Sequence, residues 1–325
     1  MIDLRKLAVL ALWLASRLAQ PAAPLRIESS VDAMGSTFTV VAYGEDRNAL
    51  QSAIDLSFEE IKRLDELLSN YKPLSEWSKI NREAASHPVR VSAELFRLLE
   101  ACLEYSRKSE GAFDITVGPL VRTWGFYKGS GRLPHRAEMR TALEKVGYRN
   151  VILDNSEFTV RFSKTGMEID PGGVGKGYAV DRLVEMLKGL GIKSALVSAG
   201  GSSIYGLGAP PNEPGWKVRI RHPRKEDESV SEVTLNNNSM STSGTSEKFF
   251  VSGGKLYSHI FDPRTGFPAP GMLSVSVIAP KTLDSEAWTK PAFILGREWA
   301  KTRLPGGLRA FFCEDRPDTP CAWLQ

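Results

Sequence analysis

Four glycines crowd around a single lysine in residues 168–182, EIDPGGVGKGYAVDR. A glycine-rich turn that leads into a helix brings backbone N–H groups close to phosphates, so this segment could bind a nucleotide. It does not match a P-loop, which requires GxxxxGK followed by Ser or Thr, because Gly177 follows Lys176 and Asp occupies position 170. The glycine spacing also differs from the dinucleotide fingerprint GxGxxG. A strand-to-helix turn that needs glycine only for its backbone is the alternative interpretation.

Two charged side chains favour the binding interpretation. Asp170 is predicted to end a strand, and Lys176 to begin a helix whose free N–H groups attract anions. An acid and a cation six residues apart across a glycine turn can contact different parts of one ligand. The acid would bind a hydroxyl or a ring N–H, while the lysine faces a phosphate. The pattern predicts a nucleotide ligand without naming it.

Cysteine and histidine usage does not indicate a zinc site. The chain has three Cys and four His, with no CxxC motif and no Cys/His cluster. Cys313 and Cys321 are close enough in sequence to form a disulfide where the geometry permits. Cys102 lies in a helical pattern and is expected to be a buried apolar side chain.

The composition of the chain is that of an ordinary globular protein. Its 325 residues are 42% hydrophobic and 25% charged, with a net charge of +4. No basic run or interleaving of basic and aromatic residues is present, so no nucleic-acid partner is expected. Residues 1–25 combine a basic start with an apolar run of ten residues, 7–16, which is too short to span a bilayer. We expect a signal peptide or an N-terminal anchor over residues 1–25, one domain over 26–325, and export.

The spacing of hydrophobic residues predicts both helices and strands along the chain. The expected helices are 47–69, 92–111, 135–147, 178–190 and one beginning at residue 283. The expected strands are 34–44, two within 151–162, two within 194–208, 216–223, 229–235, 255–263 and 274–280. Helices flank strands in the first half and hairpin-like strands dominate the second, which is typical of an α+β fold with mixed sheets.

Six segments, in this order, resemble the ApbE family, the FAD:protein FMN transferases. They are MGSTFTV (34–40), SNYKPLSEWSKIN (69–81), GAFDITVGPLVRTWGF (111–126), DPGGVGKGYAVDR (170–182), SAGGSSIYGLG (198–208) and YSHIFDPRTGFPAP (257–270). The similarity extends from Met34 to Gly296. It implies a two-lobed α+β fold of mixed, largely antiparallel sheets flanked by helices, with FAD between the lobes.

The resemblance also implies roles for individual residues. Met34 would touch the flavin, and Tyr71 would lie against its ring or ribityl chain. Asp170 and Lys176 match FAD-contacting positions, and His259 matches a histidine near the pyrophosphate. The adenosine side would be lined by Ala112, Phe113 and Asp114, and the turn that shapes the site would be completed by Asp262, Thr265 and Gly266.

The implied reaction is Mg²⁺-dependent transfer of FMN from FAD to a Thr or Ser hydroxyl through a phosphoester bond, with release of AMP. His259 is the candidate base, because imidazole titrates near neutrality, and the alternative is a strand histidine bonded to a backbone carbonyl. Water as the acceptor would make the protein an FAD pyrophosphatase. The implied acceptors are flavoprotein subunits of membrane electron-transfer complexes. The protein would then act in the periplasm or on the outer face of the inner membrane, with peripheral or anchored association with that membrane.

The chain departs from the family pattern at the metal position. The family holds Mg²⁺ with an acid, a hydroxyl four residues later and a backbone oxygen, and here these positions are Glu286, Lys290 and Gly173. Glu keeps an anionic oxygen, whereas an ammonium has no lone pair for a metal and repels it. Either Lys290 turns away, with Asp284, Ser285 or Thr289 completing the shell, or its ammonium takes the place of the metal and holds the phosphates. A non-catalytic FAD-binding protein is therefore a further alternative.

A second departure lies in SAGGSS, where the family shows Asn-Ala-Gly-Gly-Asp. Ser198 and Ser202 replace the polar pair. Hydroxyl groups still form hydrogen bonds, but a carboxylate is removed from the site.

Overall fold

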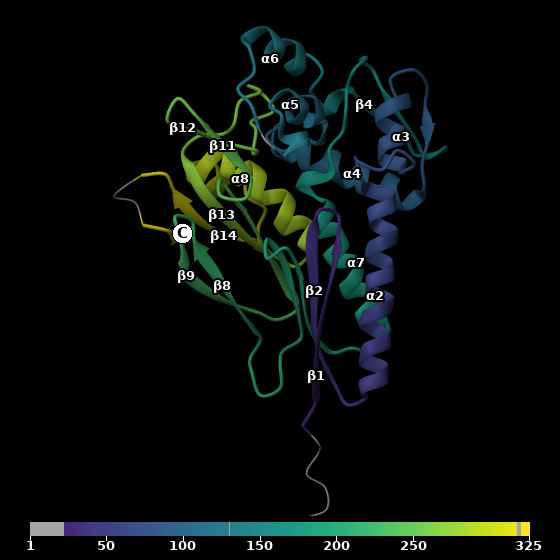
Figure 1. The fold of residues 1–325 in the computed structure, drawn as a ribbon, viewed down its shortest axis with the longest axis vertical. Helices are drawn as coiled ribbons and strands as arrows, with labels where there is room; N and C mark the ends of the chain where they lie inside the picture. The colour runs from purple at the N-terminus through teal and green to yellow at the C-terminus, as the bar shows by residue number, and fades with distance from the viewer. Residues whose placement is uncertain (1–22, 130, 317–319) are drawn as a thin grey trace, which may run out of the picture.

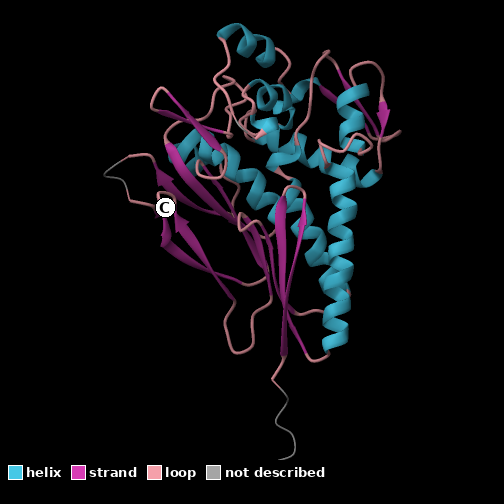
Figure 2. Ribbon diagram, viewed as in Figure 1, coloured by secondary structure: helices cyan, strands magenta, loops and turns pink. Residues whose placement is uncertain are grey.

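An eight-stranded antiparallel sheet forms the centre of the protein, and helices cover one of its faces (Figures 1 and 2). The computed structural model describes residues 23–129, 131–316 and 320–325. The strand order is β1-β2-β6-β7-β10-β13-β14-β15, and every ladder described is antiparallel. The predicted α+β class with antiparallel sheets and flanking helices is confirmed. Of the signal peptide or anchor predicted at residues 1–25, residues 1–22 lie outside the described part of the chain.

The strands of the central sheet are β1 (Leu25–Ala33), β2 (Ser36–Gly44), β6 (Ser194–Ala199), β7 (Ser203–Leu207), β10 (Asn238–Gly244), β13 (Met272–Ala279), β14 (Arg309–Glu314) and β15 (Ala322–Trp323). The remaining strands are β3 (Val89–Arg90), β4 (Val151–Asp154), β5 (Thr159–Phe162), β8 (Trp216–His222), β9 (Lys225–Leu235), β11 (Phe249–Ser252) and β12 (Lys255–Ser258). The α-helices are α2 (Arg47–Leu68), α3 (Glu76–Glu83), α4 (Ala93–Lys108), α5 (Gly118–Thr123), α6 (Arg136–Leu143), α7 (Gly175–Gly189) and α8 (Thr282–Arg303).

Alternating side chains divide the sheet into two faces. In β2, Phe38 and Val40 point to the core beneath α2 and α7, whereas Val41 points to the opposite core beneath the β8–β9 hairpin. The helix α8 packs on β10 and β13. The sheet is therefore buried on both faces, by helices on one side and by a hairpin on the other.

The first hairpin differs from the strand predicted there. The strand expected at 34–44 begins at Ser36, because Met34 and Gly35 form the turn with φ of 53° and 66°. The preceding strand, β1, was not predicted, and Leu25 is its first residue. The hairpin thus carries Met34 to its tip, at the same end of the sheet as the helical region (Figure 1).

The helical region contains α3 to α6 and a small sheet of order β3-β5-β4. Ser92 caps α4 as predicted, since its hydroxyl accepts a hydrogen bond from the Leu95 N–H at 3.3 Å. The predicted helix at 135–147 is shorter and ends at Leu143. The helix α3 begins in the segment SNYKPLSEWSKIN, ends at Glu83, and was not predicted.

Two predicted strands around the site are wrong in extent. Asp170 does not end a strand; it caps a 3₁₀ turn, Pro171–Gly173, that leads directly into α7. The strand expected at 255–263 stops at Ser258, so His259 lies in the following segment. Neither residue belongs to a strand of a sheet. The Asp170 N–H donates to the Ile115 carbonyl at 2.7 Å, and the His259 N–H donates to the Lys248 carbonyl at 3.1 Å.

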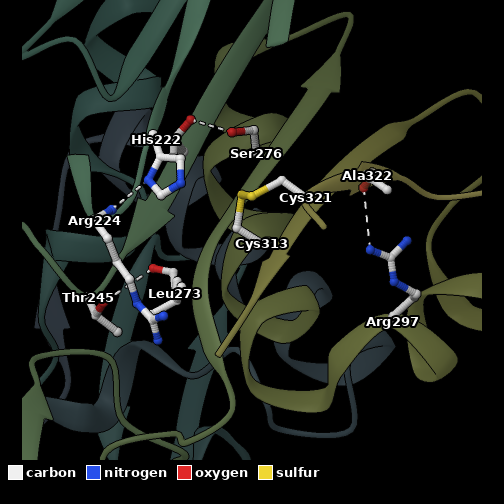
Figure 3. Close-up of a disulfide and its surroundings, with 10 residues drawn as sticks. His222, Arg224, Thr245, Leu273, Ser276, Arg297, Cys313, Cys321 and Ala322 are labelled. Atoms are coloured by element: carbon white, nitrogen blue, oxygen red, sulfur yellow. Dashed lines mark hydrogen bonds between the residues drawn. A yellow bond between two sulfur atoms is a disulfide. The ribbon is translucent and has the colours of Figure 1, made fainter. Parts of the chain in front are cut away.

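The predicted Cys313–Cys321 disulfide is present and ties β14 to the segment that enters β15 (Figure 3). Beside it, Arg297 of α8 donates to the carbonyl oxygens of Ala322 and Trp323, at 3.4 and 3.2 Å. Cys102 is buried and free, as expected. None of the helices described between residues 23 and 325 is long and apolar enough to cross a membrane.

Candidate functional site

A cavity of about 690 Å³ opens between the tip of the first hairpin, the end of α2 and the start of α7. That volume suits a ligand of nucleotide size. All the predicted ligand-binding residues line it, namely Met34, Tyr71, Ala112, Phe113, Asp114, Asp170, Lys176 and His259. Of the three predicted metal-position residues, Gly173 and Lys290 line the cavity and Glu286 does not. Sequence reasoning missed Asn70, Phe126 and Lys248, although the first two lie in quoted segments.

Asp170 is held by partners from the helical region. Its carboxylate accepts hydrogen bonds from the Gly172 N–H at 2.8 Å and from the Asn70 amide at 2.7 Å. The preceding residue, Ile169, is fixed at both of its backbone groups. Its carbonyl accepts from the indole N–H of Trp77 and the side-chain N–H of Asn81, and its own N–H donates to the Asn81 side-chain oxygen. Burial raises the pKa of Asp170, and the two hydrogen bonds oppose that shift. The arrangement presents an oriented oxygen acceptor at the cavity wall.

Lys176 is the second residue of α7, so its ammonium adds to the positive end of that helix. Its Nζ donates to the hydroxyl of Ser202, one of the two serines at the departure from the family pattern. Nowhere in the described chain does it form an ion pair within 4.0 Å. An anion in the cavity would therefore meet a cation that no protein carboxylate neutralises.

Tyr71 stands at the rim of the cavity with 65% of its surface exposed. Its ring stacks on Tyr127 with centroids 4.7 Å apart, and the Arg122 guanidinium lies 4.0 Å from the Tyr127 ring centre on which it packs. The Tyr127 hydroxyl donates to the Asn70 carbonyl at 2.9 Å. This stack provides a flat aromatic surface that a flavin ring system could cover.

Asp114 lines the cavity, but its carboxylate is committed within the protein. It accepts hydrogen bonds from the Thr116 N–H at 2.8 Å, the Thr116 hydroxyl at 2.7 Å and the Tyr148 N–H at 2.8 Å. Burial raises its pKa, and these hydrogen bonds oppose the shift. Phe113, beside it, packs edge-on against Tyr105. Asp114 therefore shapes the wall by fixing the turn that carries Ala112 and Phe113.

His259 both lines the cavity, as a candidate base must, and contacts a backbone carbonyl, as the alternative interpretation predicted. Its Nδ1 lies 3.0 Å from the backbone oxygen of Lys248, and it also lines the cavity. Because a carbonyl oxygen only accepts, Nδ1 carries the proton and Nε2 is the accepting nitrogen of the neutral ring. Burial lowers the pKa of His259, while its hydrogen bond to the Lys248 carbonyl and the charge of Glu247 oppose that shift, and the charges of Lys248 and Lys290 add to it. The imidazole is thus neutral and able to accept a proton at neutral pH.

The residues at the metal position do not fit a divalent cation. Glu286 is 2% exposed and accepts a hydrogen bond from the Gly177 N–H, at the first turn of α7, instead of facing the cavity. Lys290 faces the cavity with an ammonium, whose Nζ lies 3.1 Å from the Glu286 backbone oxygen. Burial lowers the pKa of Lys290, while the charge of Glu286 opposes that shift. Among the described residues, no group of three or more His, Cys, Asp and Glu side chains could hold a metal.

The neighbouring oxygen donors are also committed elsewhere. Asp284 accepts from the Tyr105 hydroxyl. The Ser285 hydroxyl bonds to Ser241 at 2.8 Å, and the Thr289 hydroxyl bonds to Ser243 at 2.7 Å. None of the three completes a metal shell, so that alternative for Lys290 has no support in the structure.

Gly177 is the contact point between α7 and α8, which leads to a stability prediction. A Cβ at this position would lie 2.6 Å from the Thr282 carbonyl oxygen and 2.8 Å from Glu286 Oε2. We expect Gly177→Ala to lower the free energy of unfolding by about 1–3 kcal/mol, because the two helices must separate. Urea denaturation would measure it. Gly189→Ala, at the open end of the same helix, is the control and should be neutral or slightly stabilising; equal midpoints for both variants would contradict the proposed contact.

Comparison with known proteins places this geometry in a family. The model of the ApbE family matches residues 34–312. An FAD:protein FMN transferase of Klebsiella pneumoniae is 35% identical over 269 residues, which cover 82% of this chain and 81% of the relative. That of Escherichia coli is 32% identical over 271 residues, covering 80% and 76%.

Solved structures of ApbE proteins have the same fold as this chain. An ApbE protein from Thermotoga maritima aligns with a TM-score of 0.83 at 30% identity, covering 90% of this chain and 95% of its own. The flavinyl transferase ApbE of Pseudomonas stutzeri, in its apo form, aligns with a TM-score of 0.82 at 27% identity, covering 94% and 96%. On the extent of the family match and on relatives more than 30% identical over four fifths of its length, this chain belongs to the ApbE family.

Proposed function

We propose that this protein transfers FMN from FAD to a Thr or Ser hydroxyl of an acceptor flavoprotein and releases AMP. The observation that carries the proposal is that one cavity gathers the aromatic rim at Tyr71, the acceptor Asp170, the cation Lys176 and the neutral imidazole of His259. The names of the relatives, FAD:protein FMN transferase, support the same activity. FAD would lie in this cavity, between the sheet and the helical region.

The reaction balances as a phosphoryl transfer. The acceptor oxygen attacks the phosphorus of the FMN half of FAD, and a new phosphoester bond forms while the bridging P–O bond breaks. AMP leaves with the electron pair of that bond. The hydroxyl proton passes to Nε2 of His259, which is the free accepting nitrogen of the ring, and then to solvent or to the leaving phosphate. The ammonium of Lys176 offsets charge on the phosphates.

No step of this proposal passes through Mg²⁺. The resemblance predicts a Mg²⁺-dependent enzyme, but the donor set at Gly173, Glu286 and Lys290 offers the cavity an ammonium and turns its carboxylate away. Metal dependence therefore stays a prediction of the family resemblance. Lys290 also favours a second candidate function, an FAD-binding protein that does not transfer FMN.

We further propose that the protein works outside the cytoplasm on flavoprotein subunits of membrane electron-transfer complexes, in the periplasm or at the outer face of the inner membrane. The basic and apolar start of the sequence supports export. The Cys313–Cys321 disulfide supports it independently, because such bonds persist in oxidising compartments.

A transfer assay tests the proposed function. The full chain would be incubated with FAD and a threonine-bearing acceptor peptide, and mass spectrometry should detect the FMN-linked peptide together with an equal amount of AMP. The same peptide with Thr replaced by Ala is the control and should stay unmodified. Bound FAD without any product would instead support the binding protein. AMP released without an acceptor, and without a linked peptide, would make the protein an FAD pyrophosphatase.

A further inference from the structure

Two half-buried ammonium groups line the cavity without an ion-pair partner among the described residues. Lys176 and Lys290 both line it, and neither forms an ion pair within 4.0 Å anywhere in the part of the chain that the structure describes. By contrast, Lys72, another lysine of the cavity wall, is paired with Asp65 and Glu66 at 2.6 and 2.7 Å. The two groups are close enough for the charge of Lys176 to lower the pKa of Lys290. Two ammonium groups that line one cavity without ion-pair partners create a site for an anion.

The position of Lys290 is set by backbone groups. Its Nζ donates to the Glu286 carbonyl at 3.1 Å, which occupies one of three N–H donors and leaves two for a ligand. Its Cε lies 3.7 Å from the point where a Cβ of Gly173 would stand. The side chain therefore runs between α8 and the glycine segment, and its head lies where the family resemblance places the metal.

The carboxylates around Lys290 act on it without direct contact. The Glu286 carboxylate accepts a hydrogen bond from the Gly177 N–H, and Glu247, which lines the cavity, is exposed. Their charges oppose the burial that lowers the pKa of Lys290, but neither carboxylate forms an ion pair with it within 4.0 Å. The two remaining N–H donors of the ammonium are therefore available to an anionic ligand.

The two departures from the family pattern change the charge of the site in the same direction. A hydroxyl at Ser202 in place of a carboxylate removes one negative charge, and an ammonium at Lys290 in place of a hydroxyl adds one positive charge. Together they raise the net charge by as much as the divalent cation that the resemblance places here. Ser202 also leaves Lys176 with a neutral partner, so its charge stays available to phosphates.

We propose that Lys290 and Lys176 hold the pyrophosphate of FAD directly, and that this chain binds FAD without a divalent cation. The inference rests on the proposed function, since it assumes that FAD is the ligand of this cavity. One ammonium for each phosphate matches the single negative charge that each phosphate of FAD carries. Lys290 thus takes the position of the metal, and its charge together with the carboxylate lost at Ser202 matches that of the metal.

FAD titration tests the proposal with binding as the readout. The dissociation constant of the full chain, measured by tryptophan quenching, should be the same within about twofold in EDTA and in Mg²⁺. Lys290→Thr should weaken FAD binding in EDTA by about tenfold to a hundredfold, because a charge-assisted contact to a phosphate is lost, and Mg²⁺ should restore it. Lys290→Met should weaken binding equally and gain nothing from Mg²⁺. Lys281→Thr, an exposed lysine at the start of the same helix, should change nothing.

The outcomes separate the two hypotheses. A wild-type affinity that rises tenfold with Mg²⁺ would overturn the lysine proposal and leave the FAD site intact. Undiminished binding by a folded Lys290→Met variant in EDTA would overturn it as well. Failure of the wild-type chain to bind FAD under any condition would instead defeat the proposed function. Electron paramagnetic resonance with Mn²⁺ adds a direct check: bound Mn²⁺ is expected in the FAD complex of Lys290→Thr and not in that of the wild type.

Discussion

Replacing His259 with asparagine is expected to slow FMN transfer by about 10²- to 10⁴-fold, the usual contribution of a positioned general base. Asparagine can still donate to the Lys248 carbonyl that now fixes the ring, so the surrounding turn should keep its shape. It provides no basic nitrogen at the position of Nε2. FAD affinity should therefore change little, and the loss should appear in single-turnover transfer to the acceptor peptide.

The pH profile gives this prediction a second readout. Only the neutral imidazole accepts a proton, and burial lowers the pKa of His259 below its ordinary value of 6.5. The wild-type rate should therefore be on its plateau at pH 7 and fall with acidification below pH 6.5, whereas the residual rate of His259→Asn should lack this limb.

An exposed histidine supplies the control for both readouts. His87 lies on the surface away from the cavity, and His87→Asn should keep the wild-type rate and pH profile. A His259→Asn enzyme within threefold of the wild-type rate would remove His259 from the reaction.

The sequence predicted the position of Lys176 well and the surroundings of Asp170 poorly. A glycine turn before an amphipathic pattern marks a helix start locally, and α7 does begin at Gly175. The contacts that orient Asp170 come from Asn70, 100 residues earlier, and indirectly from Trp77 and Asn81, which hold the residue before it. No local pattern records such long-range hydrogen bonds, so a strand was predicted where a capped 3₁₀ turn stands.

The orientation of the two side chains at the metal position could not be predicted from local sequence either. Glu286 and Lys290 are four residues apart on one helix, which predicts neighbouring side chains on one face. Instead, the carboxylate turns to the Gly177 N–H and the ammonium turns to the cavity. Spacing alone cannot decide this, because the choice depends on the free N–H groups of another helix. By contrast, the Cys313–Cys321 pair could be predicted, since so short a separation leaves few other arrangements.

The second large effect is expected from Trp124→Ala, which removes the residue that joins two of the six family segments. Trp124 is fully buried, and its indole N–H donates to the Gly266 carbonyl at 2.9 Å. Its ring packs among those of Tyr257, Phe261 and Phe267, with centroids 5.6 to 5.9 Å away. The truncation should lower the free energy of unfolding by about 3–5 kcal/mol, measured by urea denaturation, because it leaves a cavity among these rings.

Trp124→Phe is the milder variant at this position. It keeps a six-membered aromatic ring but loses the five-membered ring of the indole and its donor to Gly266, so we expect a smaller cost of about 1–3 kcal/mol. The segment that carries His259 packs on this cluster, and a loosened segment would misplace the imidazole before the protein unfolds. Trp124→Phe should therefore slow transfer more than it weakens FAD binding. If Trp124→Ala unfolds at the wild-type midpoint, the cluster does not hold the His259 segment.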